Sequence, residues 1–271
     1  MSFGVQPFGT APLGAEVVPP AEESGGGFWL PDSRLMAPAL LEPGRKPATP
    51  VEIDWEHKYA KDLALYMILN DTRNLADNTA GTFTGDAYID PSKGLECDGN
   101  GDTLVFSAAT RKALAFGTND FTILVKFRYE TGGGYPTLIS NGDTGSGEWM
   151  LRVASGLSFY GDAGGIAFGT SNSMVNGAVY FGVVRQEGAN CRVRLYDADF
   201  VELGFHYATT SDRDLNAENA NACLGGGDAN TNRWWKGGIE WAIALNGTEL
   251  SEEQCLDLIR NPYQFLRPKL C

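Results

Sequence analysis

Short runs of β-branched and aromatic residues, each ended by turn-forming residues, recur along the chain from about residue 51. The longest run, residues 120–129 (DFTILVKFRY), is followed closely by three consecutive glycines, as expected for a strand and its turn. Turn residues separate two pairs of runs, Ser155-Gly156 in one pair and 187–190 (EGAN) in the other, which predicts two β-hairpins. The predicted strands are 64–69, 120–129, 149–153, 157–160, 179–185, 192–197 and 238–245.

Strands spaced roughly 8 to 15 residues apart, with turns between them, predict an all-β sandwich of two antiparallel sheets. One short C-terminal helix is expected, because Ser251 and Gln254 form a capping-box pattern ahead of a helical apolar periodicity. This helix must end at Asn261-Pro262, and we expect it to pack across one sheet. The residues that follow, 263–268, are expected to extend over the surface.

Residues 1–50 have a different composition from the rest of the chain. They hold nine of the 13 prolines and repeat an apolar-Gly pair at Phe3-Gly4, Phe8-Gly9 and Leu13-Gly14. Such a segment cannot bury its own apolar side chains, whereas a groove on a partner can receive its aromatic residues. The sequence therefore predicts an extended docking arm, 1–50, ahead of one sandwich domain, 51–271, although a simple linker remains the alternative. The candidate docking residues are Phe3, Phe8, Phe28 and Trp29.

The charge balance and the cysteines exclude several classes of protein. With 21 basic and 34 acidic residues, the net charge of -13 repels phosphate backbones, so no nucleic-acid partner is expected. The sequence contains no run of about 18 apolar residues, so no membrane insertion is expected, and its first residues lack the pattern of a signal peptide. The five cysteines are scattered without a C-x-x-C pair, which predicts thiols in a reducing cytosol.

Several segments, in the right order, resemble the laminin-G-like, concanavalin A-like jelly roll. Residues 95–106 resemble its strand, Asp-Gly turn and second strand, and residues 179–197 resemble its central strand pair. The likeness covers about residues 60–266 and implies a two-sheet antiparallel jelly roll. The segments that carry it are 95–106, 121–127, 137–140, 149–153, 179–185, 193–197, 224–226, 235–241 and 250–254.

Residues 261–265 (NPYQF) and the apolar-Gly arm also resemble segments of bacteriophage structural proteins. This second resemblance implies a non-enzymatic virion protein, either a head decoration, a head fibre or a tail-associated subunit, that is assembled in the host cytoplasm. Its expected partners are capsid or tail proteins of the same virion and further copies of itself in a homo-oligomer. Because the same sandwich fold also serves lectins and glycosidases, the fold alone does not decide the function.

A carbohydrate-binding role, directed at a host surface glycan, is the first alternative. Trp234 and Trp235, beside Asn230 and Asn232, would offer aromatic faces to sugar C–H groups and amides to sugar hydroxyls. The competing interpretation is that one tryptophan enters the core and the other lies at an interface.

A glycoside hydrolase is the second alternative. Glu52, Asp54 and Glu56 alternate along the chain, so a strand would place all three carboxylates on one face. Retaining glycosidases of this sandwich class use such a Glu-x-Asp-x-Glu strand. The motif precedes the first predicted strand of the sandwich, however, so we favour an acidic, solvated strand edge or linker end.

A calcium site is suggested by Asp98, Asn100 and Asp102, which offer oxygen ligands at alternate positions. The glycine and the bidentate glutamate of an EF-hand loop are missing, and Asp-Gly and Asn-Gly are ordinary turn formers. We therefore favour a turn over a metal site, and the sequence calls for no cofactor.

Overall fold

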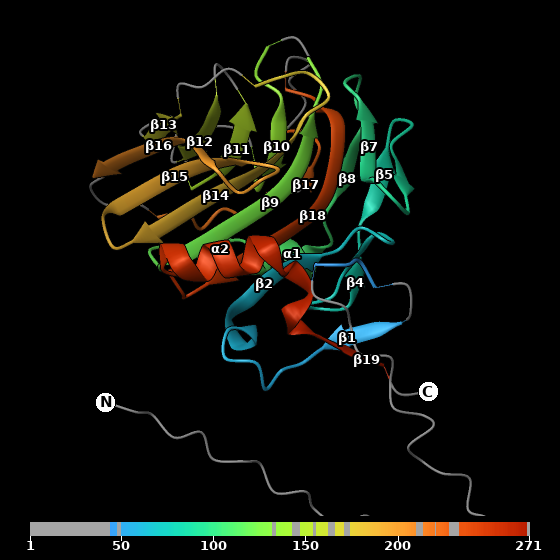
Figure 1. The fold of residues 1–271 in the computed structure, drawn as a ribbon, viewed down its shortest axis with the longest axis horizontal. Helices are drawn as coiled ribbons and strands as arrows, with labels where there is room; N and C mark the ends of the chain where they lie inside the picture. Colours follow the sequence, from blue (N-terminus) through green and yellow to red (C-terminus); the bar gives the residue numbers. More distant parts are fainter. Residues whose placement is uncertain are drawn as a thin grey trace, which may run out of the picture. The chain divides into compact units, whose positions relative to one another are not determined.

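The computed structural model describes residues 44–47, 50–131, 134–142, 147–153, 156–161, 166–170, 174–209, 214–219, 221–227 and 233–269. All of these residues belong to one compact unit, Ala39–Cys271. Within it two antiparallel sheets face each other as a sandwich, and the helix α2 (Glu252–Arg260) lies across the outer face of one of them (Figure 1). The predicted fold class is therefore confirmed.

The larger sheet is built around the two longest strands, β9 (Phe121–Tyr129) and β18 (Lys236–Asn246). Its strand order is β16-β15-β14-β9-β18-β7-β6, and β2 pairs with the far end of β18, beyond β7. Both central strands are apolar on two faces because each face has its own core. The other members are β2 (Leu63–Met67), β6 (Tyr88–Asp90), β7 (Gly94–Asp98), β14 (Val179–Glu187), β15 (Asn190–Asp197) and β16 (Glu202–Thr209).

The second sheet has the order β13-β12-β11-β10-β17-β8-β5. Its strands are β5 (Thr82–Thr84), β8 (Thr103–Val105), β10 (Thr137–Ser140), β11 (Trp149–Val153), β12 (Leu157–Gly161), β13 (Ile166–Gly169) and β17 (Cys223–Leu224). Two short antiparallel pairs lie apart from both sheets, β1 (Val51–Ile53) with β19 (Leu266–Pro268) and β3 (Arg73–Asn74) with β4 (Thr79–Ala80).

Two hydrophobic clusters hold these layers together. The first fills the space between the sheets, where the rings of Phe116, Phe121 and Trp149 stack with centroids 4.4 and 5.1 Å apart. The second lies between the outer face of the larger sheet and α2, which contributes its buried residues Cys255 and Leu258. The helix therefore covers one sheet, as expected.

The start of α2 also follows the prediction from sequence. The Ser251 hydroxyl accepts a hydrogen bond from the Gln254 N–H, and the Gln254 side chain accepts one from the Ser251 N–H. These two bonds satisfy donors that a helix N-terminus would otherwise leave without partners. The helix ends at Arg260, immediately before Asn261-Pro262.

Three details differ from the sequence-based expectations. Residues 263–265 do not extend over the surface, because a 3-10 helix (η3, Pro262–Phe265) turns Tyr263 and Phe265 into the second cluster. The strands within 95–106 do not form a hairpin, since β7 and β8 belong to different sheets. A short helix, α1 (Ala108–Ala113), with Ser107 as its cap, was not expected.

No described helix combines the length and the apolar character needed to cross a membrane. The cysteines of the described part, Cys97, Cys191, Cys223 and Cys255, are buried thiols. Burial is the main reason that the pKa of the Cys97 thiol is raised and that of Cys255 is raised to about 12.

The candidate docking residues Phe3, Phe8, Phe28 and Trp29 lie outside the described residues, so the docking arm stays a prediction. The residues just before β1 hydrogen-bond to the domain. The Gly44 N–H donates to the Asn261 side chain, and the Lys46 ammonium donates to the carbonyls of Leu69 and Pro91.

Candidate functional site

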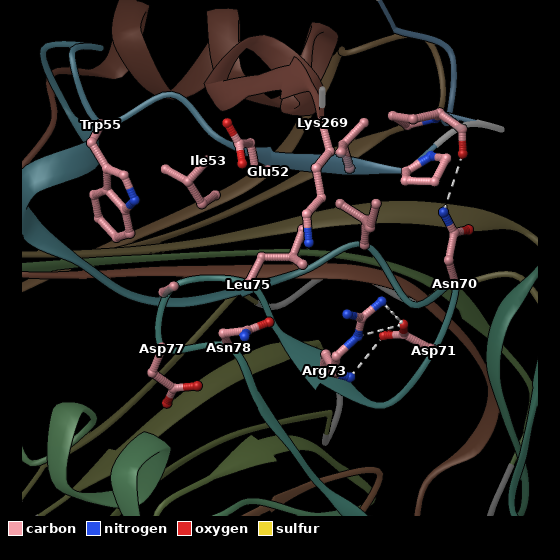
Figure 2. Close-up of a pocket in the computed structure, with 15 residues that line it drawn as sticks. Glu52, Ile53, Trp55, Asn70, Asp71, Arg73, Leu75, Asp77, Asn78 and Lys269 are labelled. Atoms are coloured by element: carbon pink, nitrogen blue, oxygen red, sulfur yellow. Dashed lines mark hydrogen bonds and ion pairs between the residues drawn. The ribbon is translucent and has the colours of Figure 1, made fainter. Parts of the chain in front are cut away.

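A pocket of about 610 Å³ opens between the β1–β19 pair and the segment 70–78 (Figure 2). Its floor is apolar, with Ile53 and Ile68 buried and Leu75 partly buried in the second cluster. Polar side chains surround this floor. The complete lining is Pro47, Pro50, Val51, Glu52, Ile53, Trp55, Ile68, Asn70, Asp71, Arg73, Leu75, Ala76, Asp77, Asn78 and Lys269.

One wall of the pocket ends in an exposed aromatic side chain, Trp55. The backbone of Asp54 fixes its position, because the Asp54 N–H donates to the Phe265 carbonyl and the Asp54 carbonyl accepts from His57. The Asp54 carboxylate also accepts the Glu56 N–H. Trp55 therefore stands on a closed turn with 52% of its surface exposed, and Figure 2 shows its ring at one end of the pocket.

The opposite wall is held by Asn74, a buried amide whose residue is 1% exposed. Its oxygen accepts hydrogen bonds from the N–H groups of Tyr66 and Ala76, at 2.8 and 3.1 Å. Its nitrogen donates to the Ala64 carbonyl and to the Thr110 hydroxyl. Because β2 supplies two of these partners, the wall is fixed to the larger sheet.

Two carboxylates of the wall are already engaged in the fold. Asp71 accepts the Arg73 N–H at 2.9 Å and pairs with the Arg73 guanidinium at 2.6 Å. Asp77 accepts three hydrogen bonds, two from Thr79 and one from Thr110. These contacts shape the segment and leave other polar groups for a ligand.

Lys269 and Asn78 are those other groups. In the described part of the chain, neither side chain forms a hydrogen bond or an ion pair. Figure 2 shows the Lys269 side chain reaching from the β1–β19 wall towards Leu75. Glu52 binds Arg267 through one carboxylate oxygen, at 2.8 Å.

This arrangement suits a ligand that is polar at its edges and apolar on one face. The side chains of Lys269 and Asn78 supply donors and an acceptor, and the Trp55 ring supplies a flat apolar surface. A sugar ring has both properties, with hydroxyls at its edge and C–H groups on its faces. The pocket is large enough for such a ring.

Residues 52–56 do not form the single strand that the glycosidase alternative requires. β1 ends at Ile53, and Asp54 and Glu56 lie in the following turn. Glu52 is therefore the only member of the motif on a strand, where it faces Arg267 across the β1–β19 pair. The aligned strand face that the glycosidase alternative requires is therefore not formed by Glu52, Asp54 and Glu56.

The predicted tryptophan platform divides into two different environments. Trp235 is fully buried and contacts Phe127 edge-on, so its face is closed to a ligand. Trp234 is half-buried beside the glycine backbone at Gly101 and Gly226. The interpretation that one tryptophan enters the core therefore holds for Trp235. Asn230 and Asn232 lie outside the described residues.

The calcium candidate forms a turn with a buried acid. Asp102 is 1% exposed and accepts the N–H groups of Asp98 and Asp86, at 2.8 and 2.9 Å. Burial is the largest reason that the pKa of its carboxyl is raised. One carboxylate oxygen from each of Asp86, Asp98 and Asp102 lies within 4.8 Å of the others. Asn100 is not part of this group, and its N–H caps the Asp98 carboxylate instead.

Sequence patterns missed the pocket because its lining comes from separate parts of the chain, around 47–55, 68–78 and residue 269. No single segment carries a recognisable spacing. The available signal was Trp55 in a polar setting beside the three acids, which were considered as catalytic groups.

Comparisons with known proteins show the fold but no family. No protein-family model matches the sequence. No curated protein matches it either.

Solved structures resemble the chain at low identity. Domain 4 of AbnA, a GH43 extracellular arabinanase from Geobacillus stearothermophilus in complex with arabinotriose, has 16% identity and a TM-score of 0.54 over 73% of this chain and 98% of that one. A mutant Trypanosoma rangeli sialidase has 15% identity and a TM-score of 0.57 over 74% of this chain. This chain spans 33% of that sialidase. The CBM40 of Ruminococcus gnavus IT-sialidase, bound to α2,3-sialyllactose, has 12% identity and a TM-score of 0.47 over 60% of this chain and 95% of that one. The chain thus shares the β-sandwich, jelly-roll-like fold of carbohydrate-binding and glycoside hydrolase domains.

Proposed function

We propose that this chain is a non-catalytic carbohydrate-binding protein and that the pocket beside Trp55 receives a saccharide. The observation that carries the proposal is a half-exposed tryptophan at the end of a pocket that also holds polar side chains, Lys269 and Asn78, with no partner among the described residues. A neutral sugar would stack on the Trp55 ring and hydrogen-bond to Lys269 and Asn78.

The fold comparison supports the same class of ligand. Domain 4 of AbnA was solved in complex with arabinotriose and aligns over nearly its whole length. Its identity of 16% carries no ligand-binding residue over to this chain. Arabinotriose is therefore the first probe to test, and other neutral oligosaccharides are tested after it.

Binding is proposed rather than hydrolysis because the acids that line the pocket are engaged elsewhere. Asp71 pairs with Arg73, Glu52 with Arg267, and Asp77 accepts three hydrogen bonds. Glycoside hydrolysis requires one acid to donate a proton and a second to act as nucleophile or base. The predominant contacts of these three carboxylates are structural.

The proposal is tested by calorimetric titration of the full chain with arabinotriose and with a panel of neutral oligosaccharides. The Trp55→Ala variant should bind the best saccharide at least tenfold more weakly, a loss of about 1.4 kcal/mol or more, because the stacking surface is removed. Trp55→Phe should retain most of the affinity.

Tyr88→Ala is the matched control. Tyr88 is 56% exposed on β6, and it is not among the residues that line the pocket. Its loss should leave saccharide affinity unchanged. The proposal fails if no saccharide binds the full chain, or if Trp55→Ala binds as well as the unchanged protein.

The virion role expected from the sequence rests on a resemblance of residues 261–265 and of the arm, and the arm's candidate docking residues lie outside the described part of the chain. The two functions are compatible, because a virion protein can carry a saccharide-binding domain. Incorporation into particles of a chain that lacks residues 2–45 would test that role independently of the pocket.

A further inference from the structure

Arg152 and Arg185 are equally buried, each 7% exposed, but their surroundings differ. The Arg185 guanidinium binds the carboxylate of Glu249. Arg152 has no ion pair, and its Nε is a buried donor without a hydrogen-bond partner in the described part of the chain. A buried charge without a counter-charge is unfavourable, so this exception calls for an explanation.

Among the described residues, the strands next to Arg152 do not supply a carboxylate. Arg152 lies on β11, opposite Thr137 of β10 and Ser158 of β12. Leu151 and Val153 point into the core between the sheets, so Arg152 points to the outer face of the smaller sheet. Its cross-strand neighbours there carry hydroxyl groups rather than acids.

Two tyrosine rings cover part of the guanidinium. Its Cζ lies 3.4 Å from the centroid of the Tyr160 ring and 4.4 Å from that of Tyr135. At 3.4 Å the Tyr160 ring is in direct contact with the guanidinium and covers one side of it. The N–H groups along the edge of the guanidinium are what remain for a ligand.

We propose that Arg152 is the centre of a second ligand site, on the outer face of the smaller sheet, that binds a carboxylate group. A carboxylate matches the edge of a guanidinium with two parallel hydrogen bonds, one of them to the unpartnered Nε–H. This site shares no residue with the pocket beside Trp55. It therefore goes beyond the proposed function and does not depend on it.

The surroundings favour an anionic ligand that also carries an apolar face. Arg233 lies close by, since its Nη1 approaches the Met150 sulfur at 3.9 Å and its carbonyl accepts the Thr137 N–H. Burial lowers the pKa of both arginines, which shows that both charges are partly removed from water. Tyr135 is 51% exposed, and movement of its ring would open the edge of Arg152 to a ligand.

The ligand class that we infer is a sugar acid, because its carboxylate would pair with Arg152 and its ring would contact Tyr135. Glucuronate is the probe, with acetate as the carboxylate without a ring and glucose as the ring without a carboxylate. Sulfate serves as a tetrahedral anion that does not match the planar edge of the guanidinium.

The first experiment follows the Nε–H signal of Arg152 by NMR in the unchanged full-length protein. Glucuronate should shift this signal saturably, and acetate should shift it with weaker affinity. Equal affinities would identify a simple carboxylate as the ligand, and would still support the site. Glucose should have no effect.

The second experiment compares Arg152→Met with Arg260→Met. Arg260 also lies over an aromatic ring, Phe200, and forms no ion pair in the described part of the chain, but it is exposed. Arg152→Met should bind glucuronate at least tenfold more weakly, whereas Arg260→Met should bind it as the unchanged protein does.

Stability without ligand separates a binding role from a purely structural one. If Arg152 awaits a ligand, Arg152→Met should melt at the same temperature as the unchanged protein or higher, because an unpaired buried charge is removed. The proposal is overturned if the Arg152 Nε–H signal does not respond to glucuronate and acetate, or responds equally to sulfate. Since that measurement uses the unchanged protein, it decides the question even if the variant does not fold.

Discussion

At the scale of single residues, Asn74 and Asn78 illustrate two separate roles within one pocket. Asn74 is buried and makes four hydrogen bonds that fix the wall, whereas Asn78 is exposed and makes none in the described part of the chain. Their chemistry is the same, and their positions are four residues apart. The pair therefore allows the support of the site to be separated from its contact with a ligand.

Asn74→Ala should lower the free energy of unfolding by about 2 to 4 kcal/mol, because the buried N–H of Tyr66 and the partly buried N–H of Ala76 lose their acceptor. Asn78→Ala should weaken saccharide binding and lower stability by only about 1 kcal/mol, the cost of placing alanine at the left-handed backbone of residue 78, where φ is 58°. Urea unfolding and calorimetric titration measure the two effects. Equal stability of both variants would contradict the role assigned to Asn74.

At the scale of secondary-structure elements, the capping box of α2 gives a direct test of how the second cluster is closed. Ser251→Ala should destabilise the protein by about 1 kcal/mol, because the Gln254 N–H loses its acceptor. Ser251→Asp should restore most of this loss, since a carboxylate also caps a helix and suits its N-terminus. Thermal unfolding of both variants provides the measurement. A Ser251→Asp variant no better than Ser251→Ala would argue against the cap.

The sequence was sufficient to predict most strands and the final helix, because their signals are local. The run at 120–129 became β9, and the capping pattern at Ser251 became the start of α2. Which of the two sheets a strand joins depends on its partner strands elsewhere in the chain, so local sequence does not determine it. Residues 95–106 contain two strands, as expected, but the turn between them passes from one sheet to the other.

The errors have similar physical causes. Pro262 begins a tight 3-10 turn, and the burial of Tyr263 and Phe265 against α2 and the larger sheet stabilises it, so residues 263–265 do not extend. The pocket was not predicted because three distant segments form it. Sequence patterns did not single out Trp55, because the turn that exposes it depends on a hydrogen bond from the Asp54 N–H to the distant Phe265 carbonyl.

At the scale of the whole molecule, the described residues contain both hydrophobic clusters, and their first member is Ile53. A chain that begins at Ala39, the start of the compact unit, should therefore unfold within a few degrees of the full-length protein. It should also bind the same saccharide with the same affinity. Calorimetric unfolding of both chains tests this, and a large drop in melting temperature would show that residues 1–38 contribute to the fold.

The pairing of β1 with β19 has a practical consequence. Glu52 faces Arg267 across this pair, and the Lys269 N–H donates to the Pro50 carbonyl, so the chain enters and leaves the domain at adjacent points (Figure 1). Domains with neighbouring entry and exit points tolerate insertion into a loop of a host protein, and also tolerate joining of their ends with new termini opened elsewhere. This domain is therefore suited to insertion into a host protein. The linkers to the host would join it next to the opening of the pocket beside Trp55.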